Sequence, residues 1–337
     1  MVFLDYASTC PTVKFSSQQY GGFHCNPNAA YAYAERKTLM DCEERIKAAI
    51  GVKSGHVLYF RCATEAIDWL VGDIGGRAHS PYEHDACTLG VEIAPDKVVA
   101  ADFYIHQWVN HITGEIFDLN TIRSQLPNAC KLVVDATAGF GKAKLPSGLD
   151  DIADALFMSG HKIGCPELSF MWISDNLCEW LGAAKDIRNQ WGLHHGSLSV
   201  ASVMALTDAV EWACENGDRV DGHSVRLYVR MNDMLNKACI EHHDVIERQA
   251  FTASINAIRL NGINADALQQ FLASRGIYVG VGGSACSAAH DYRVLRAYGL
   301  TDVEASEVIR VSFGEETTAR DIEALVEGIK EYRRQFC

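Results

Sequence analysis

The segment Ala155-Leu-Phe-Met-Ser-Gly-His-Lys162 joins a short apolar run to a lysine that follows it closely. An uninterrupted apolar run of this length is typical of a strand buried on both faces, as in a parallel sheet. A lysine beside a histidine directly after such a strand does not lie on an ordinary solvated face. Partial burial lowers the pKa of a lysine amine, which suits it to attack a carbonyl compound. A solvated surface lysine is the alternative for this residue taken alone.

Strand and helix patterns alternate on both sides of this segment, which predicts an α/β fold with a mostly parallel sheet. Strands are expected at residues 56–60, 98–103, 132–135, 155–158, 169–173, 254–260 and 308–313, and helices at residues 29–50, 64–72, 199–216, 220–241, 265–275 and from 318 onward. The pattern changes near residue 242, which predicts a smaller C-terminal α+β domain. Ligands of open α/β sheets bind beyond the carboxyl ends of the strands, so the residues there are candidates for a site.

The composition of the 337-residue chain excludes several classes of protein. A hydrophobic fraction of 48% allows a sizeable core in about two domains. The net charge of −13 argues against direct nucleic-acid binding. No apolar run reaches the ~18 residues of a membrane span and no signal peptide is visible, so we expect a cytoplasmic protein. The twelve cysteines form no CxxC pair, which predicts reduced thiols and no metal site.

Three further segments carry polar residues in positions suited to a ligand. Arg61-Cys-Ala-Thr-Glu65 opens a helix after a strand, where free N–H groups favour a phosphate; helix capping by Thr64 is the alternative. Asp135 ends a buried strand, which is costly unless a cationic cofactor nitrogen or a structural cation pairs with it. Arg310 interrupts an apolar strand, which indicates either a carboxylate clamp or a salt bridge.

One cysteine stands in a setting suited to a nucleophile. The stretch Gly282-Gly-Ser-Ala-Cys-Ser287 surrounds Cys286 with small residues. Such residues leave the backbone mobile and the sulfur accessible, as a nucleophilic thiol requires.

Taken in order, these segments resemble the class V pyridoxal-phosphate enzymes, and within them the cysteine desulfurases. The resemblance covers nearly the whole chain and is carried by Leu4-Asp-Tyr6, Cys25-Asn-Pro-Asn28, Ala63-Thr-Glu65, Glu83-His84, Asp135-Ala136, Ser159-Gly-His-Lys162, Gly282 to Ser287, Val294-Leu-Arg-Ala-Tyr-Gly-Leu300 and Ile309-Arg310. It implies a fold-type I homodimer. The large domain would span residues 15–240 with a seven-stranded sheet, and residues 1–14 and 241–337 would form a small domain carrying the Cys286 loop.

The resemblance also implies a role for each candidate residue. Lys162 would bond covalently to pyridoxal 5'-phosphate, Asp135 would keep the ring nitrogen protonated, and His84 would stack on the ring and move protons. The other implied cofactor-binding residues are Ala63, Thr64, Ser159, His161, Asn110, His111 and Ser197, the last reaching across the dimer interface. Arg310, with Asn110, would bind the carboxylate of L-cysteine. Cys286 would attack the substrate sulfur, leaving a persulfide and alanine.

Several positions depart from the family pattern. Ala138 stands where relatives carry glutamine, His111 aligns with an asparagine unless Asn110 has taken that role, and His194 replaces an active-site cation. These changes predict a specialised desulfurase that feeds an acceptor protein, for example for DNA phosphorothioation. They also predict activity that depends on pH near neutrality. Two alternatives stay open: another class V lyase or aminotransferase, and a degenerate scaffold that binds a sulfur-transfer partner without turnover.

Overall fold

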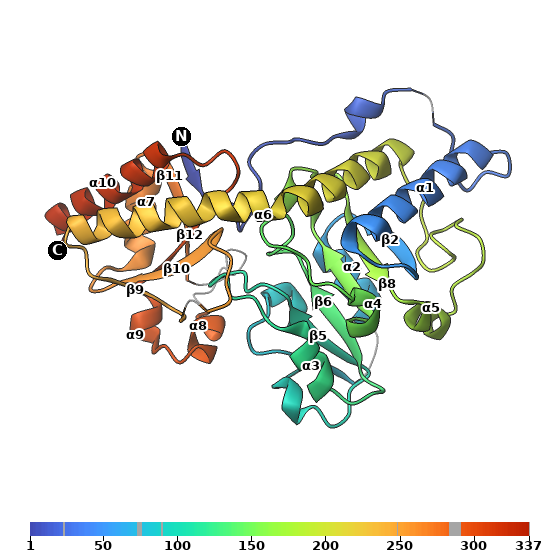
Figure 1. The fold of residues 1–337 in the computed structure, drawn as a ribbon, viewed down its shortest axis with the longest axis horizontal. Coiled ribbons are helices and arrows are strands. Elements are labelled where there is room, and N and C mark those ends of the chain that lie inside the picture. The colour runs from blue at the N-terminus through green and yellow to red at the C-terminus, as the bar shows by residue number, and fades with distance from the viewer. Residues whose placement is uncertain (23, 73–75, 89, 248, 283–290, 337) are drawn as a thin grey trace.

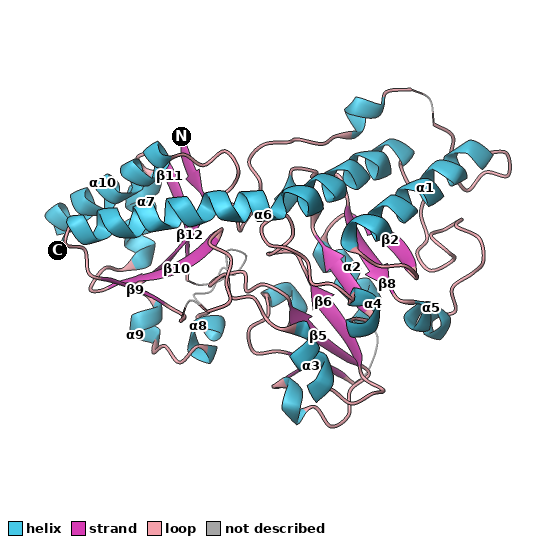
Figure 2. Ribbon diagram, in the orientation of Figure 1, coloured by secondary structure: helices cyan, strands magenta, loops and turns pink. Residues whose placement is uncertain are grey.

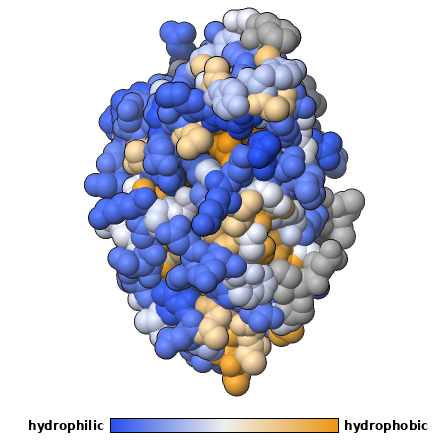
Figure 3. All heavy atoms as spheres, turned by 90° about the vertical axis from the view of Figure 1, so that its right-hand side faces the viewer, coloured by the Kyte–Doolittle hydropathy of each residue, from blue (hydrophilic) through white to orange (hydrophobic). Residues whose placement is uncertain are grey.

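The computed structural model describes residues 1–22, 24–72, 76–88, 90–247, 249–282 and 291–336. These residues form two sheets, and the long helix α6 (Val200–Lys237) runs past both of them (Figure 1). Among the described helices, none combines the length and apolar character needed to cross a lipid bilayer. The end of the molecule seen in Figure 3 is largely hydrophilic, with apolar side chains in small groups, as expected for so acidic a chain.

The larger sheet has seven strands and confirms the predicted mostly parallel architecture. Its order is β2 (His56–Phe60), β8 (Ser169–Ile173), β7 (Ala155–Met158), β6 (Lys131–Asp135), β5 (Phe103–Gln107), β3 (Arg77–His79) and β4 (Val91–Glu92). Strand β8 runs antiparallel to both of its neighbours, and the pairings from β7 to β4 are parallel. Because β7 and β8 are buried along their whole length, they have continuous apolar sequences instead of alternating ones.

The smaller sheet joins the start of the chain to its last third. Its order is β1 (Val2–Leu4), β11 (Ile277–Val281), β12 (Val308–Ser312), β10 (Ile255–Leu260) and β9 (His242–Asp244). Helices α7 (Ala265–Ala273) and α10 (Ala319–Phe336) pack on it beside the second half of α6, so both chain ends lie on the same side in Figure 1. The bounds of the two predicted domains stay a prediction.

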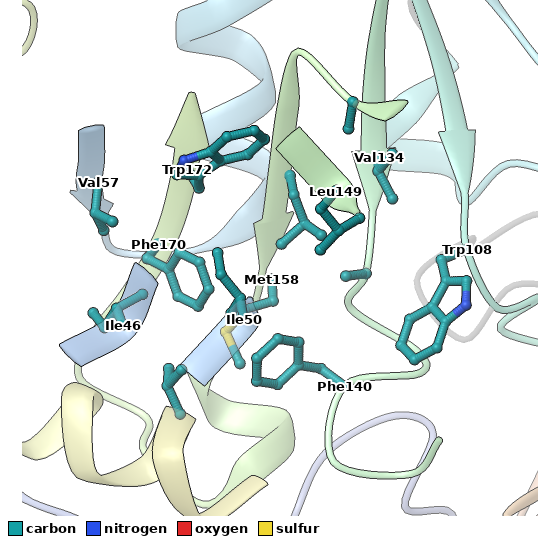
Figure 4. Packing of buried hydrophobic residues seen from close by; sticks show 14 of the residues in the cluster. Ile46, Ile50, Val57, Trp108, Val134, Phe140, Leu149, Met158, Phe170 and Trp172 are labelled. Atoms are coloured by element: carbon teal, nitrogen blue, oxygen red, sulfur yellow. The ribbon is translucent and has the colours of Figure 1, made fainter. Parts of the chain in front are cut away.

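Helices lie against the strands of the large sheet (Figure 2). Aromatic and branched side chains fill the space between them (Figure 4). Phe140 meets Phe170 edge to face at 6.0 Å, beside Met158 and next to Ile50 of α1 (Tyr33–Ile50). This packing fixes the loop that follows β6 and the candidate residue Asp135.

Shorter helices complete the fold. They are α2 (Ala63–Val71), α3 (Leu119–Gln125), α4 (Leu149–Ile152), α5 (Asp175–Leu181), α8 (Arg293–Ala297) and α9 (Asp302–Ala305).

Two sequence-based expectations were wrong. The strand expected at 98–103 lies later, at Phe103–Gln107, since Val99 is exposed and the polar members of the true strand, His106 and Gln107, hide its buried character. The break expected near Gly217 does not occur, because α6 continues through it. A Cβ at Gly217 would lie 3.0 Å from the carbonyl oxygen of Ala143, so this glycine permits close packing and does not end the helix.

Candidate active site

A cavity of about 240 Å³ opens at the carboxyl ends of β6 and β7, beside the first turn of α2 and the strand β12. The structure brings most of the predicted site residues together around it. Its lining includes Ala63, Thr64, His84, His111, Asp135, Ser159, His161, Lys162 and Arg310. Asn110, His194 and Ser197 do not line it, and Cys286 lies outside the described residues.

Lys162 is positioned by a tight turn after β7. The turn Gly160–Ile163 requires a glycine at its start, because a Cβ at Gly160 would lie 2.1 Å from the carbonyl oxygen of Leu168. The Lys162 amine donates a hydrogen bond of 2.8 Å to the carbonyl oxygen of Ala7. The N-terminal segment that follows β1 therefore forms one wall of the site.

Asp135 provides a carboxylate that lines the same cavity. Its Oδ1 accepts a hydrogen bond from the backbone N–H of Thr137 at 2.8 Å, and the thiol of Cys87 lies 3.6 Å from Oδ2. Behind it, burial and the negative charge of Asp135 raise the pKa of Glu83 to about 8. Glu83 therefore holds a proton at neutral pH.

The hydrogen bonds of His84 fix its tautomer. Its Nδ1 accepts from the backbone N–H of Ala86 at 3.1 Å, so the neutral ring carries its proton on Nε2. Burial and the nearby Lys162 ammonium lower the pKa of His84. The ring is therefore a hydrogen-bond donor towards the cavity, rather than a cation.

His111, and not Asn110, reaches the cavity. The Nδ1 of His111 lies 3.2 Å from Oε1 of Gln107, an oxygen that only accepts, so the proton is on Nδ1. Burial and the neighbouring His84 hold the pKa of His111 well below its ordinary value. Asn110 instead stabilises its own turn, because its Oδ1 accepts from the N–H groups of Ile112 and Thr113 at 2.9 Å each.

Arg310 is buried and has part of its guanidinium unused. Nη1 donates to the carbonyl oxygen of His111 at 3.0 Å and Nη2 pairs with Oδ1 of Asp5 at 2.8 Å. Its Nε has no partner among the described residues. The salt-bridge interpretation of Arg310 thus holds, and the carboxylate clamp stays a prediction.

His194 and Ser197 belong to a loop outside this cavity. Asn189, Gln190 and Trp191 have φ of 51°, 51° and 59°, an unusual left-handed turn. The Gln190 amide stabilises it by binding both the N–H (2.6 Å) and the carbonyl oxygen (3.3 Å) of Tyr59 on the edge strand β2. His194 bonds to Gln190 at 3.0 Å, and Ser197 is exposed to solvent.

Several residues that shape the site were given no individual role from the sequence. They are Asp5, Ala7 and Ser8 after β1, Cys62 and Cys87 beside the cavity, Gln107 under His111, and Thr137 next to Asp135. The position of Thr137 directly after a buried strand was a usable signal. Nothing local in the sequence links Asp5 to Arg310.

These residues fit pyridoxal 5'-phosphate. An amine, a carboxylate and an imidazole face one cavity, and the N-cap residue of α2, Cys62, makes no side-chain capping bond. The first N–H groups of α2 are thus available to a phosphate. Thr64 lies inside the helix and does not cap it, so the capping alternative was wrong. Thr137 also has a buried hydroxyl without a partner among the described residues.

Fold and site together define a fold-type I pyridoxal-phosphate enzyme. Residues 96–325 match the family model "Aminotransferase class-V". The chain therefore belongs to the class-V aminotransferase family, and its cofactor is pyridoxal 5'-phosphate. The resemblance drawn from the sequence motifs is confirmed.

Similar proteins agree with this assignment. A putative cysteine desulfurase NifS of Halalkalibacterium halodurans is 23% identical, with 98% of each chain covered. A cysteine desulfurase IscS of Mannheimia succiniciproducens is 26% identical, covering 98% of this chain and 92% of its own. A solved NifS-like protein of Rickettsia africae superposes with a TM-score of 0.80 at 17% identity, covering 99% of each chain, and so shares the fold.

Proposed function

We propose that the chain is an L-cysteine desulfurase that moves the substrate sulfur to Cys286 and releases alanine. The observation that carries the proposal is that Lys162, Asp135 and Arg310 line one cavity, so that an amine, a carboxylate and a guanidinium lie around the same space. These groups suit the binding of a small α-amino acid through its carboxylate. Relatives described as cysteine desulfurases support the same substrate.

Each residue has a defined task in this proposal. Pyridoxal 5'-phosphate supplies an electron sink when bound. Asp135 holds the proton of the ring nitrogen, and the first turn of α2, with Ser159 and His161, binds the phosphate. Burial and the Lys162 ammonium lower the pKa of His161 to about 4, so this ring stays neutral and contacts the phosphate as a hydrogen-bond donor.

Arg310 and His84 act on the substrate. Arg310 orients its carboxylate while remaining paired to Asp5. His84 presents Nε2–H to the cavity and serves as a hydrogen-bond donor there. The Cys286 thiolate attacks the substrate sulfur, so that an S–S bond forms as the bond between that sulfur and Cβ breaks. The role of Cys286 rests on the sequence alone.

The finer parts of the proposal concern partners. Ser197 lies on an exposed loop away from its own cavity, which favours a homodimer in which it completes the phosphate site of the second subunit. The persulfide sulfur then passes to an acceptor protein, and the altered residues Ala138, His111 and His194 favour a specialised acceptor, for nucleic-acid modification such as DNA phosphorothioation.

Persulfide mapping tests the proposal. The purified holoenzyme is incubated with L-cysteine, alanine is quantified, and the thiols are alkylated and mapped by mass spectrometry. Equimolar alanine and a persulfide on Cys286 are expected. Cys286→Ala should abolish both, whereas Cys239→Ala, which removes an exposed thiol, should change neither. Full activity of Cys286→Ala on L-cysteine would exclude the persulfide route and favour another class V reaction.

A further inference from the structure

A second, smaller cavity of about 30 Å³ lies behind the active-site lysine. Lys162 and Lys142 both line this cavity. Lys142 stands in the loop after β6, where its carbonyl oxygen accepts a bond of 2.8 Å from the Thr252 hydroxyl. This bond and the left-handed Gly141 fix the position from which the side chain starts.

The Lys142 amine is buried without a counter-charge. The residue is 5% exposed, and its Nζ has no hydrogen-bond partner among the described residues. Lys14 and Glu315 also line the cavity, but they pair with each other at 2.7 Å. The other lining residues with polar side chains are Cys10, Tyr6 and Trp212.

An unpaired ammonium in such a place is costly, and a second ammonium beside it adds repulsion. Burial and the positive charge of Lys162 lower the pKa of Lys142 to about 7, with Arg310 adding to the repulsion and Cys10 opposing it. Lys142 therefore gains and loses a proton easily at neutral pH. The mechanism described so far gives this residue no task.

We propose that Lys142 and Lys162 share one proton at neutral pH, and that Lys142 takes the proton Lys162 must lose before its amine can bond to the cofactor aldehyde. In this step an N–H bond on Lys162 breaks and an N–H bond on Lys142 forms, so the positive charge moves from one amine to the other. A cavity of about 30 Å³ can hold a water molecule that carries the proton between them. Lys142 is thus a positioning residue that acts through Lys162.

The inference rests on the cofactor site of the proposed function, and it is tested without L-cysteine. Cofactor-free protein is mixed with pyridoxal 5'-phosphate at pH 5.5 to 10, and the rate of covalent capture on Lys162 is followed by absorbance and by borohydride trapping. With Lys142→Met the proton stays on Lys162, so the profile should shift to higher pH by about one unit. With Lys142→Arg a permanent charge stands beside Lys162, so the profile should shift to lower pH.

A packing defect would lower the capture rate in both variants, but it would not shift the two pH profiles in opposite directions. Unchanged midpoints in both variants would overturn the inference. If a variant fails to fold, the wild-type apoprotein tests the inference instead. It is treated with acetic anhydride over the same pH range, and acylation of Lys162 is mapped by mass spectrometry. Reactivity that rises near pH 7 supports the shared proton, and reactivity that rises only above pH 9 refutes it. Failure to release alanine from cysteine would count against the proposed function and leave this result intact.

Discussion

Replacing Glu83 by glutamine should make the cofactor-free protein more stable at neutral pH. Glu83 is fully buried, and burial together with the charge of Asp135 raises its pKa to about 8 from an ordinary 4.5. The folded protein thus binds a proton that the unfolded chain has released, and stability falls as pH rises from 4.5 to 8. Glutamine has nearly the same shape as protonated glutamate, and its side chain is neutral without binding a proton. Its Oε1 can still accept from the Ser80 hydroxyl (2.7 Å) and the Gln107 N–H (2.8 Å).

The size of the effect follows from the pKa difference. Each pH unit above 4.5 is worth about 1.4 kcal/mol until the folded pKa is reached. The carboxyl group of Glu83 therefore costs the folded state about 3 kcal/mol at pH 7 and about 1 kcal/mol at pH 5. The Glu83→Gln variant should exceed the wild type in stability by up to those amounts, and the gain should shrink as pH falls.

Urea unfolding of apoprotein at pH 5, 6 and 7, followed by circular dichroism, measures these differences. Glu179→Gln, which changes an exposed acid on α5, is the matched control and should show no such trend. A Glu83→Gln protein that is no more stable than the wild type at pH 7, or one whose gain is independent of pH, would refute the assignment of a buried neutral acid behind Asp135.

Three further outcomes are expected. Lys162→Ala should keep the far-ultraviolet spectrum of the fold but lose the visible absorbance of bound pyridoxal 5'-phosphate after gel filtration; retained colour would contradict the covalent role. Gln190→Ala should lower the urea-unfolding free energy by about 2 kcal/mol, since it leaves the Tyr59 N–H unpaired and the left-handed turn unsupported; an unchanged midpoint would show that the turn holds itself. Burial lowers the pKa of His106 to about 4, so its ring must protonate on unfolding below pH 6.5, and stability falls as pH drops from 6.5 towards 4. His106→Phe should remove about 2 kcal/mol of the loss between pH 7 and pH 5, and equal acid sensitivity of the two proteins would count against a neutral buried ring.

The sequence predicted those parts of the site that follow directly from buried strands. Asp135 and Lys162 stand within a few residues of a continuous apolar run, so their place at a strand end could be inferred. The salt bridge between Asp5 and Arg310 could not, because it joins two positions that only the closed fold brings together. The contact between the Gln190 side chain and the edge strand β2 could not be predicted either. No local sequence pattern indicates a left-handed turn that lacks consecutive glycines.

The sequence predicted that His111 and His194 make the activity depend on pH near neutrality, and their burial in the structure changes this prediction. Burial lowers the pKa of both His111 and His194, so protonation of these rings moves to more acidic pH. The ordinary pKa of free histidine, which guided the expectation, applies only to a ring that water reaches on most sides. The shared proton of Lys142 and Lys162 is the better candidate for a response between pH 6 and 8.

The pairing of Val2 with Ile277 has a consequence for how the enzyme is made. The ribosome releases the first strand long before its neighbour exists, and at cellular elongation rates the wait is tens of seconds. During that interval Asp5 lacks its partner Arg310 and Ala7 lacks its partner Ser312, so the pocket lacks a wall. Nascent chains therefore lack this wall of the cofactor pocket until β11 and β12 have been synthesised.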